Sequence, residues 1–295
     1  MPWFSYHGGH SGQYCRHAKG EAAAVVERAI ECGFTHYGLS EHCPRDRAED
    51  LFPDEKDLAP ADLARTFAAY TRDAFALRDR YGDRIDLLVG FETERLPPGR
   101  WEARMRELRA SAPFDYVIGS VHDVGGICID YNVEGTRAAA DANGGVEALQ
   151  IAYFDAVTDL VQTLKPEVVG HIDLIRKFDG ADARFSPRVF QHIERALEAA
   201  RAAGSVLDVN AAPARRKLGA VYPLPEILER ARVIGVGVTL GDDGHGPHDV
   251  GVGLDACMQA IAAAGYREVH YLAHVDGAAR LCSAPLADVR PASRA

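Results

Sequence analysis

The sequence predicts an α/β fold in which a parallel sheet closes into a barrel. Short apolar strands alternate with helical segments over seven or eight rounds, and this alternation is typical of parallel β/α units. Nearly every predicted strand is followed by a His, Asp, Asn or Glu side chain. Because barrel enzymes carry their chemistry at the carboxyl ends of the strands, these side chains would meet at one face. The alternative, an open doubly wound sheet, would concentrate its site in one crevice.

The first half of the chain contains four predicted strands with helices between them. The first helix shows the pattern clearly, since Val25 and Ala29 fall on one helical face and Gly33 ends the run. The predicted strands cover residues 3–6, 35–40, 86–90 and 114–120, and the predicted helices cover residues 21–32, 61–80 and 100–111.

The second half repeats the same alternation. Residues 132–145 are polar and rich in Gly and Ala, and we expect a loop there. We expect residues 283–295 to form a disordered tail and residues 1–282 to form a single barrel domain. The predicted helices cover residues 146–164, 187–203, 225–232 and 257–264, and the predicted strands cover residues 167–170, 205–210, 236–240 and 269–272.

The composition excludes several classes of protein. Hydrophobic residues make up 47% of the 295 residues, which is ordinary for a globular protein with a core. The net charge of -10 argues against broad nucleic-acid binding but not against a small anionic substrate. We expect no membrane partner, because no apolar run is long enough to span a bilayer. The six cysteines form no C-x-x-C pair, and the amino terminus does not resemble a signal peptide, so we expect a cytoplasmic protein.

Three histidines lie within eleven residues near the amino terminus. His7, His10 and His17 belong to a loop rich in Gly that follows the first predicted strand. Imidazole is the commonest metal-binding side chain, and a flexible loop lets several rings converge. A set of surface histidines is the alternative, and the later strand ends argue against it. The neighbouring Cys15 and Cys43 could be ligands, but we expect them to fill space near the site.

The full set of strand-end candidates exceeds what one metal ion uses. Two or three divalent ions are therefore predicted, with Glu92 as the bridging carboxylate in preference to Glu94. Mixed nitrogen and oxygen donors suit Zn, Mn or Fe, and clustered divalent ions suit the hydrolysis of phosphate esters. Arg176 and Arg215 are candidates to grip the phosphate oxygens. The candidate metal ligands are His7, His10, His17, His42, Glu92, His122, His171, Asp243 and His245.

These residues occur in motifs whose order resembles the polymerase and histidinol phosphatase (PHP) superfamily, and within it the monofunctional histidinol-phosphatases. The resemblance extends from about His7 to Val252. The last three motifs are Asp208-Val-Asn210, the stretch from Arg215 to Pro223, and Asp242-Asp-Gly-His245. The earlier ones are His10-Ser-Gly-Gln-Tyr-Cys-Arg-His17, Leu39-Ser-Glu-His-Cys-Pro-Arg45, Gly90-Phe-Glu92, Gly119-Ser-Val-His122 and Val169-Gly-His-Ile-Asp173.

The resemblance implies a distorted, TIM-like (β/α)7 barrel with up to three divalent metal ions. It implies hydrolysis of L-histidinol phosphate to L-histidinol and phosphate in histidine biosynthesis, with Asp243, His245 and Glu92 as catalytic residues and phosphate held by Arg176 and Arg215. The implied ligand groups are His7, His10, Glu92 and Asp243 for one ion, Glu92, His122 and His171 for a second, and His17, His42 and His245 for a third.

The opening motif departs from the family pattern. The family commonly has His-x-His, whereas here two glycines separate His7 from His10. In an extended strand residues i and i+3 face opposite sides, so His7 is the ligand whose placement depends most on the local backbone. We expect the two glycines to form a bulge that restores the convergence of the two rings.

Two other functions compete with histidinol phosphate hydrolysis. The first is a PHP phosphoesterase that acts on another small phosphate ester or nucleotide, although the acidic charge counts against long nucleic acids. The second is an accessory module without catalysis, and the complete ligand set counts against it. Phosphate release from a panel of esters separates the three.

Overall fold

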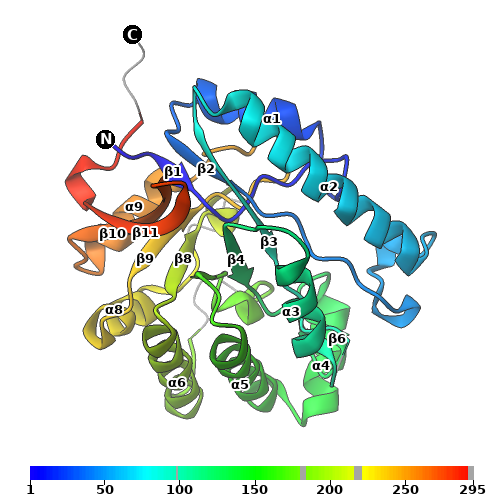
Figure 1. Ribbon diagram of the computed structural model, residues 1–295. Helices are drawn as coiled ribbons and strands as arrows, with labels where there is room; N and C mark the ends of the chain where they lie inside the picture. The colour runs from blue at the N-terminus through cyan, green and yellow to red at the C-terminus, as the bar shows by residue number, and fades with distance from the viewer. Residues whose placement is uncertain (98, 180–183, 216–220, 292–295) are drawn as a thin grey trace.

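The computed structural model describes residues 1–97, 99–179, 184–215 and 221–291, and seven of the strands in that part of the chain form one parallel sheet (Figure 1). Neighbouring strands pair in the order β1-β2-β3-β4-β7-β8-β9. Their bounds are β1 Phe4–Ser5, β2 His36–Leu39, β3 Asp86–Glu92, β4 Tyr116–Gly119, β7 Val168–Val169, β8 Val206–Asn210 and β9 Val238–Gly241.

The sheet comes close to closing into a barrel. Just beyond β1, the amide of Tyr6 donates a hydrogen bond to the carbonyl of Leu240 on β9 at 3.0 Å. The amide of Asp243 then donates to the carbonyl of His7 at 2.7 Å, which holds the two chain segments together beyond their strands. The predicted barrel is therefore confirmed, with seven parallel strands among the described residues.

Helices surround the sheet, as Figure 1 shows. Some of the helix ends carry common capping residues. The α6 helix begins after Ser186, whose hydroxyl accepts a hydrogen bond from the Val189 amide at 3.3 Å, and it ends at Gly204, which is left-handed. The helix bounds are α1 Ala22–Glu31, α2 Pro60–Tyr81, α3 Trp101–Ser111, α4 Val133–Asn143, α5 Val146–Leu164, α6 Pro187–Ala203, α7 Ala212–Arg215, α8 Pro225–Ile234 and α9 Leu254–Ala263.

The side chain of Tyr116 fills part of the barrel interior, and its position requires glycine at residue 38. The Tyr116 hydroxyl donates to the carbonyl of Tyr6 at 2.7 Å. A Cβ on Gly38 would lie 2.2 Å from this hydroxyl and 2.8 Å from the Tyr6 Cα. Only glycine therefore fits at this position of β2, and β1 and β2 can pack closely below the strand ends.

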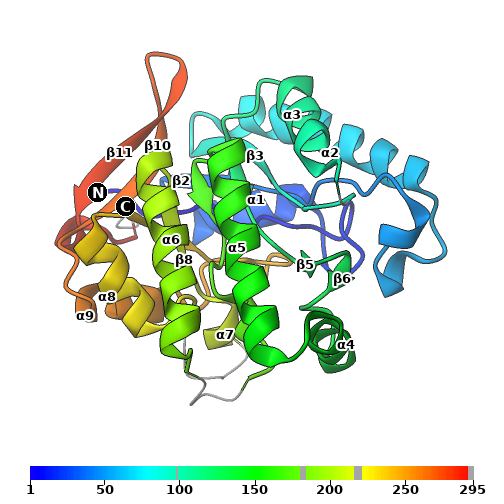
Figure 2. The ribbon, with the colours of Figure 1, turned by 90° about the horizontal axis from the view of Figure 1, so that it is seen from below.

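The prediction of a loop at residues 132–145 is wrong, because most of this segment forms α4. Asn132 caps the helix by accepting a hydrogen bond from the Gly135 amide at 2.8 Å, and Gly144 ends it in the left-handed conformation. The alanines that made the segment look like a loop are good helix formers. The α4 helix lies beside the short hairpin of β5 (Asp123–Val124) and β6 (Ile127–Cys128), as Figure 2 shows.

The carboxyl-terminal region also differs from the prediction. The short last strand is the longer β10 (Glu268–Val275), and it pairs with β11 (Ala278–Pro285) in an antiparallel hairpin that forms its own two-stranded sheet (Figure 2). The predicted tail is therefore ordered at its start, because residues 283–285 pair within this hairpin. Residues 292–295 lie outside the described part of the chain. In the described residues, no helix is long and apolar enough to cross a bilayer.

The hairpin is attached to the end of the barrel where the strands begin. His274 on β10 contacts two carboxylates there, with Nδ1 at 2.6 Å from Asp86 and Nε2 at 3.1 Å from Asp115. Burial lowers the pKa of His274, but the hydrogen bond to Asp86 and the charge of Asp115 outweigh it and hold the pKa above its ordinary value. His36, which lies 3.9 Å from Asp86, shares the same carboxylate.

The contact of His274 with the two carboxylates predicts a free energy of unfolding that depends on pH. Because the folded pKa of His274 is raised, its contribution is fully present below the unfolded pKa and is lost as the pH rises through the folded value. The free energy of unfolding lost in His274→Gln should therefore be larger at about pH 6 than at about pH 8. Urea unfolding of both proteins at each pH measures the difference. An equal loss at the two pH values would show that the pKa of His274 is the same in the folded and unfolded states.

Candidate metal centre

The predicted ligands come together where the barrel strands end. A cavity of about 240 Å³ lies at this face. His7 and His10 lie beneath it and are buried. The predicted ligands that line the cavity are His17, His42, Glu92, His122, His171, Asp243 and His245.

Glu92, the last residue of β3, is at the centre of this group. Its Oε1 lies 3.0 Å from His7 Nε2, 3.2 Å from His122 Nε2 and 3.2 Å from His171 Nε2. Its Oε2 lies 2.9 Å from His42 Nδ1. A single buried carboxylate therefore faces ring nitrogens from four separate strand ends, which is the position that a bridging ligand requires.

The two glycines between His7 and His10 allow the pair to converge. Gly8 and Gly9 have φ values of 141° and 75°, which side chains disfavour. A Cβ on Gly8 would lie 2.3 Å from Oδ1 of Asp242. The expected convergence is confirmed, because one donor atom each from His7, His10 and Asp243 lies within 4.8 Å of the others.

Three buried carboxylates hold the outer nitrogens of three of the candidate ligand histidines. His7 Nδ1 lies 2.6 Å from Asp208 on β8, and His10 Nδ1 lies 2.9 Å from Glu41. In the third pair, His122 Nδ1 lies 3.2 Å from Glu94. Such contacts fix the ring so that Nε2 faces inward, and they make the ring a better donor.

Sequence reasoning gave these carboxylates little weight. It treated Glu94 as the alternative to Glu92, and in the structure Glu94 contacts His122 and Arg45 instead. The signal for Asp208 was a carboxylate within an apolar strand, and the signal for Glu41 was its position next to His42. A buried carboxylate needs a partner, but the partner becomes visible only in the folded barrel.

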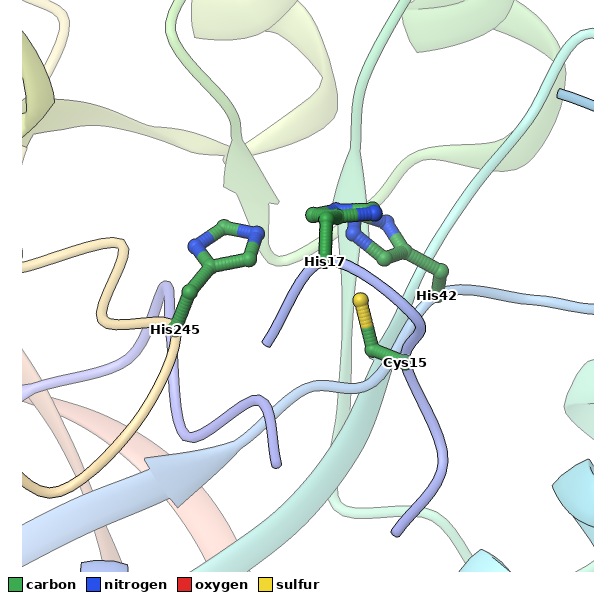
Figure 3. A group of neighbouring side chains, drawn as sticks. All are labelled: Cys15, His17, His42 and His245. Carbon is green, nitrogen blue, oxygen red and sulfur yellow. The ribbon is translucent and has the colours of Figure 1, made fainter. Parts of the chain in front are cut away.

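A second group of histidines lies to one side of Glu92. One donor atom each from Cys15, His17, His42 and His245 lies within 4.8 Å of the others, and Figure 3 shows the four side chains converging. His10 connects the two groups, because its ring stacks at 4.4 Å on both His42 and His245.

The electrostatics favour metal donors in this second group. Burial and the nearby His10 lower the pKa of His42 well below its ordinary value and lower that of His245 to about 3, so both rings are neutral. Burial raises the pKa of the Cys15 thiol, whereas the backbone amides of His17 and Ala18 favour the thiolate. The net pKa is raised, so the thiol is protonated at neutral pH.

The acidic donors are ionised although they are buried. Burial alone would raise the pKa of Glu92, but His7 and His122, whose own pKa values are raised, outweigh it and hold the Glu92 pKa well below the ordinary range. Burial would also raise the pKa of Asp243, but His7 and the Arg215 guanidinium are among the groups that lower it below its ordinary value. Both carboxylates can therefore accept a cation at neutral pH without first losing a proton.

The loop after β9 is fixed by a neighbouring carboxylate. Asp242 accepts hydrogen bonds from the Gly244 amide at 3.0 Å, the Gly251 amide at 2.9 Å and the Tyr37 hydroxyl at 3.1 Å. Asp243 follows with a φ of 50°, and its Oδ2 accepts a hydrogen bond from Asn210 Nδ2 at 3.2 Å. Asp242 therefore anchors the turn that directs Asp243 into the site.

The two arginines predicted to hold phosphate do not line the cavity. Arg176 donates from Nε to Asp173 at 2.6 Å and from Nη2 to the Val221 carbonyl at 2.6 Å, and it lies over the Tyr222 ring at 4.6 Å. Arg215 donates from Nη2 to the carbonyl of Asp243 at 2.7 Å. Each arginine thus contacts a residue that lines the cavity, since Tyr222 and Asp243 both do. Residues 216–220 of the Arg215 motif lie outside the described residues.

The cavity wall includes residues that the sequence analysis missed. Lys177 and Asp130 line the cavity as an ion pair at 3.2 Å. Burial raises the pKa of Asp130, but Lys177 and His122 outweigh it and lower the pKa, so the carboxylate is charged. The rings of Phe52 and Tyr131 also line the cavity, stacked with centroids 6.4 Å apart. Their types gave no signal in the sequence, because aromatic and charged loop residues are usually unrelated to a site.

The centre fits divalent metal ions because buried polar atoms lack partners there. Within the described part of the chain, the buried atoms without a hydrogen bond include His7 Nε2, His10 Nε2, His42 Nε2 and Glu92 Oε1. A buried polar atom without a partner costs free energy, so such atoms seldom gather unless something else satisfies them. Neutral imidazole and ionised carboxylate are the donors of zinc and related ions.

Known proteins are similar to this chain in sequence and in fold. The PHP domain family matches residues 7–212 of the chain. A protein of Schizosaccharomyces pombe named "probable histidinol-phosphatase" is 40% identical over 248 residues, covering 82% of this chain and 81% of that protein. The histidinol-phosphatase of Saccharomyces cerevisiae is 26% identical over 291 residues, covering 86% of this chain and 87% of that protein.

A solved structure agrees with the fold. It is histidinol phosphate phosphatase from Lactococcus lactis, complexed with zinc, L-histidinol and phosphate. It has a TM-score of 0.72 to this chain at 22% identity, and the match covers 94% of this chain and 98% of that one. The match to the domain over residues 7–212 and the 40% identity to the Schizosaccharomyces protein establish that this chain belongs to the PHP domain family.

Proposed function

We propose that this chain is a histidinol-phosphatase, a hydrolase that converts L-histidinol phosphate and water to L-histidinol and phosphate in histidine biosynthesis. One observation carries the proposal, namely that Glu92 faces ring nitrogens from four strand ends beside a cavity large enough for a small ester. The 40% identity to a relative that carries this name supports the substrate. Six free thiols support a cytoplasmic location.

The site is proposed to hold two or three divalent transition-metal ions. When bound, such ions supply positive charge to the phosphoryl oxygens and lower the pKa of water at the site. Zn, Mn and Fe suit the donor types. The groups that would hold the ions are those that the family resemblance implied: His7, His10, Glu92 and Asp243 for the first, Glu92, His122 and His171 for the second, and His17, His42 and His245 for the third.

The cavity wall suits the rest of this substrate. Histidinol phosphate carries an anionic phosphate, an ammonium group and a flat imidazole ring. The Lys177 ammonium offers a cation for a phosphate oxygen, and the charged Asp130 beside it offers an acceptor for the substrate ammonium. Phe52 and Tyr131 offer flat faces to a ring. Arg176 and Arg215 are positioning residues here, because they act through Tyr222 and Asp243.

Metal content tests the centre directly. The purified protein should hold at least two transition-metal ions per chain by elemental analysis, and chelation should abolish phosphate release. Glu92→Gln should lose at least one ion per chain, because it removes the charge that the ions share, and kcat/KM should fall more than about 100-fold.

The matched control for Glu92→Gln is Asp155→Asn. Asp155 on α5 also contacts a histidine, since it lies 2.6 Å from His192 Nδ1, but the pair is on the outer helices. This variant should keep its ions and its activity. Normal metal content in Glu92→Gln would contradict the bridging role.

A panel of esters tests the substrate. Phosphate release from L-histidinol phosphate should exceed release from nucleoside monophosphates and p-nitrophenyl phosphate by at least about 100-fold in kcat/KM, because these lack the ammonium group. Comparable rates on a nucleotide would favour the broader PHP phosphoesterase instead. No release from any ester by metal-loaded protein would leave only the accessory module.

A further inference from the structure

We propose that the Cys15 thiolate completes a four-donor metal site with the imidazoles of His17, His42 and His245, and that this sulfur donor makes the site selective for zinc. The sequence analysis treated Cys15 as a residue that fills space, and the structure places its sulfur among three histidine rings. The inference rests on the metal centre of the proposed function and concerns one of its ion positions.

The geometry supports a donor role for the sulfur. Sγ of Cys15 and one nitrogen from each of the three rings all lie within 4.8 Å of one another. Figure 3 shows the Cys15 side chain pointing toward the rings and away from its own backbone loop. His17, His42 and His245 line the substrate cavity but Cys15 does not, so the sulfur approaches from the protein side.

The loop backbone fixes the direction of the sulfur. The Cys15 amide donates to the Ser11 carbonyl at 2.9 Å, and the Ala18 amide donates to the Cys15 carbonyl at 3.2 Å. The Gly12 amide donates to the Gly20 carbonyl at 2.9 Å, which closes the loop at its base. Cys15 and His17 therefore leave one rigid turn side by side, whereas His42 and His245 come from the ends of β2 and β9.

An unsatisfied buried nitrogen gives independent evidence for a ligand at this place. His42 Nε2 is buried and has no hydrogen-bond partner among the residues that the structure describes. The fully buried His10 ring stacks on both His42 and His245 and holds these two rings beside each other. The sulfur therefore lies in a cluster of donors that includes an unsatisfied nitrogen, and it is not an isolated cysteine in a core.

The donor set predicts which metal binds and how. One thiolate and three imidazoles form the closed tetrahedral set of a zinc site. Sulfur favours zinc over the harder Mn²⁺ and Mg²⁺ ions. As the ion binds, the S–H bond breaks, the sulfur–metal bond forms and the proton leaves to solvent. The thiolate also cancels one positive charge, which lowers the repulsion between this ion and its neighbours.

Cobalt substitution tests the sulfur ligand without measuring activity. The full chain loaded with Co²⁺ should show a near-ultraviolet sulfur-to-cobalt charge-transfer band. Cys15→Ser and Cys15→Ala should lose this band and retain the weaker visible bands of the histidine sites. Cys43→Ser is the matched control, because Cys43 is also buried and follows His42, and it should keep the band.

A measurement on the unaltered zinc protein covers the case in which the variants fail to fold. X-ray absorption at the zinc edge should detect one sulfur neighbour per chain at about 2.3 Å. Uptake of cobalt with no charge-transfer band, or a zinc spectrum without sulfur, would overturn the role of Cys15 and leave the metal centre intact. Failure to take up either metal would overturn both proposals.

Discussion

The structure of the site depends on one buried carboxylate that faces several strands at once. Glu92 ends the long β3 strand, and its two oxygens lie within 3.2 Å of ring nitrogens from four other segments of the chain. A buried carboxylate has a high cost unless its charge is compensated. The histidines around it keep its pKa low. Some of their own buried nitrogens have no hydrogen-bond partner among the described residues, as expected for donors that bind cations.

Three further buried carboxylates fix the orientation of histidine rings in the same site. Asp208, Glu41 and Glu94 each hold the Nδ1 atom of one inner histidine. The inner atoms are therefore aimed by contacts whose own positions are set by strand register. Close packing at the strand ends also requires glycine at positions 8, 38 and 241, because a Cβ there would lie between 2.1 and 2.3 Å from the nearest atom. Backbone packing at the strand ends thus sets how closely the donors approach.

The sequence was sufficient to predict which candidate ligands come together, because they all follow the ends of barrel strands. A period of strand, loop and helix predicts which residues reach one face, and the residue type then indicates a metal. Even His7, which departs from the family spacing, converges as the two glycines suggested. Its role as a ligand stays a prediction, as do the roles of the other eight candidate residues.

Features that arise from distant segments were missed. The sulfur of Cys15 meets His245 only because the barrel brings the first and last strands together, so sequence proximity to His17 was a weak signal. The pairing of Lys177 with Asp130 joins two loops separated by 47 positions. The α4 helix was missed for a local reason, since alanines and glycines were read by composition and the cap at Asn132 was overlooked. The β10–β11 hairpin contacts the barrel through His274, which lies against Asp86 and Asp115 from distant segments.

Anomalous diffraction from crystals grown with zinc tests whether Glu92 organises the metal centre. We expect at least two zinc peaks per chain, with two of them next to the Glu92 carboxylate on either side of its oxygens. Peaks at that carboxylate would show that one residue from β3 is shared between ions. A single peak confined to His17, His42 and His245, or no peak near Glu92, would contradict the claim that this carboxylate organises the site.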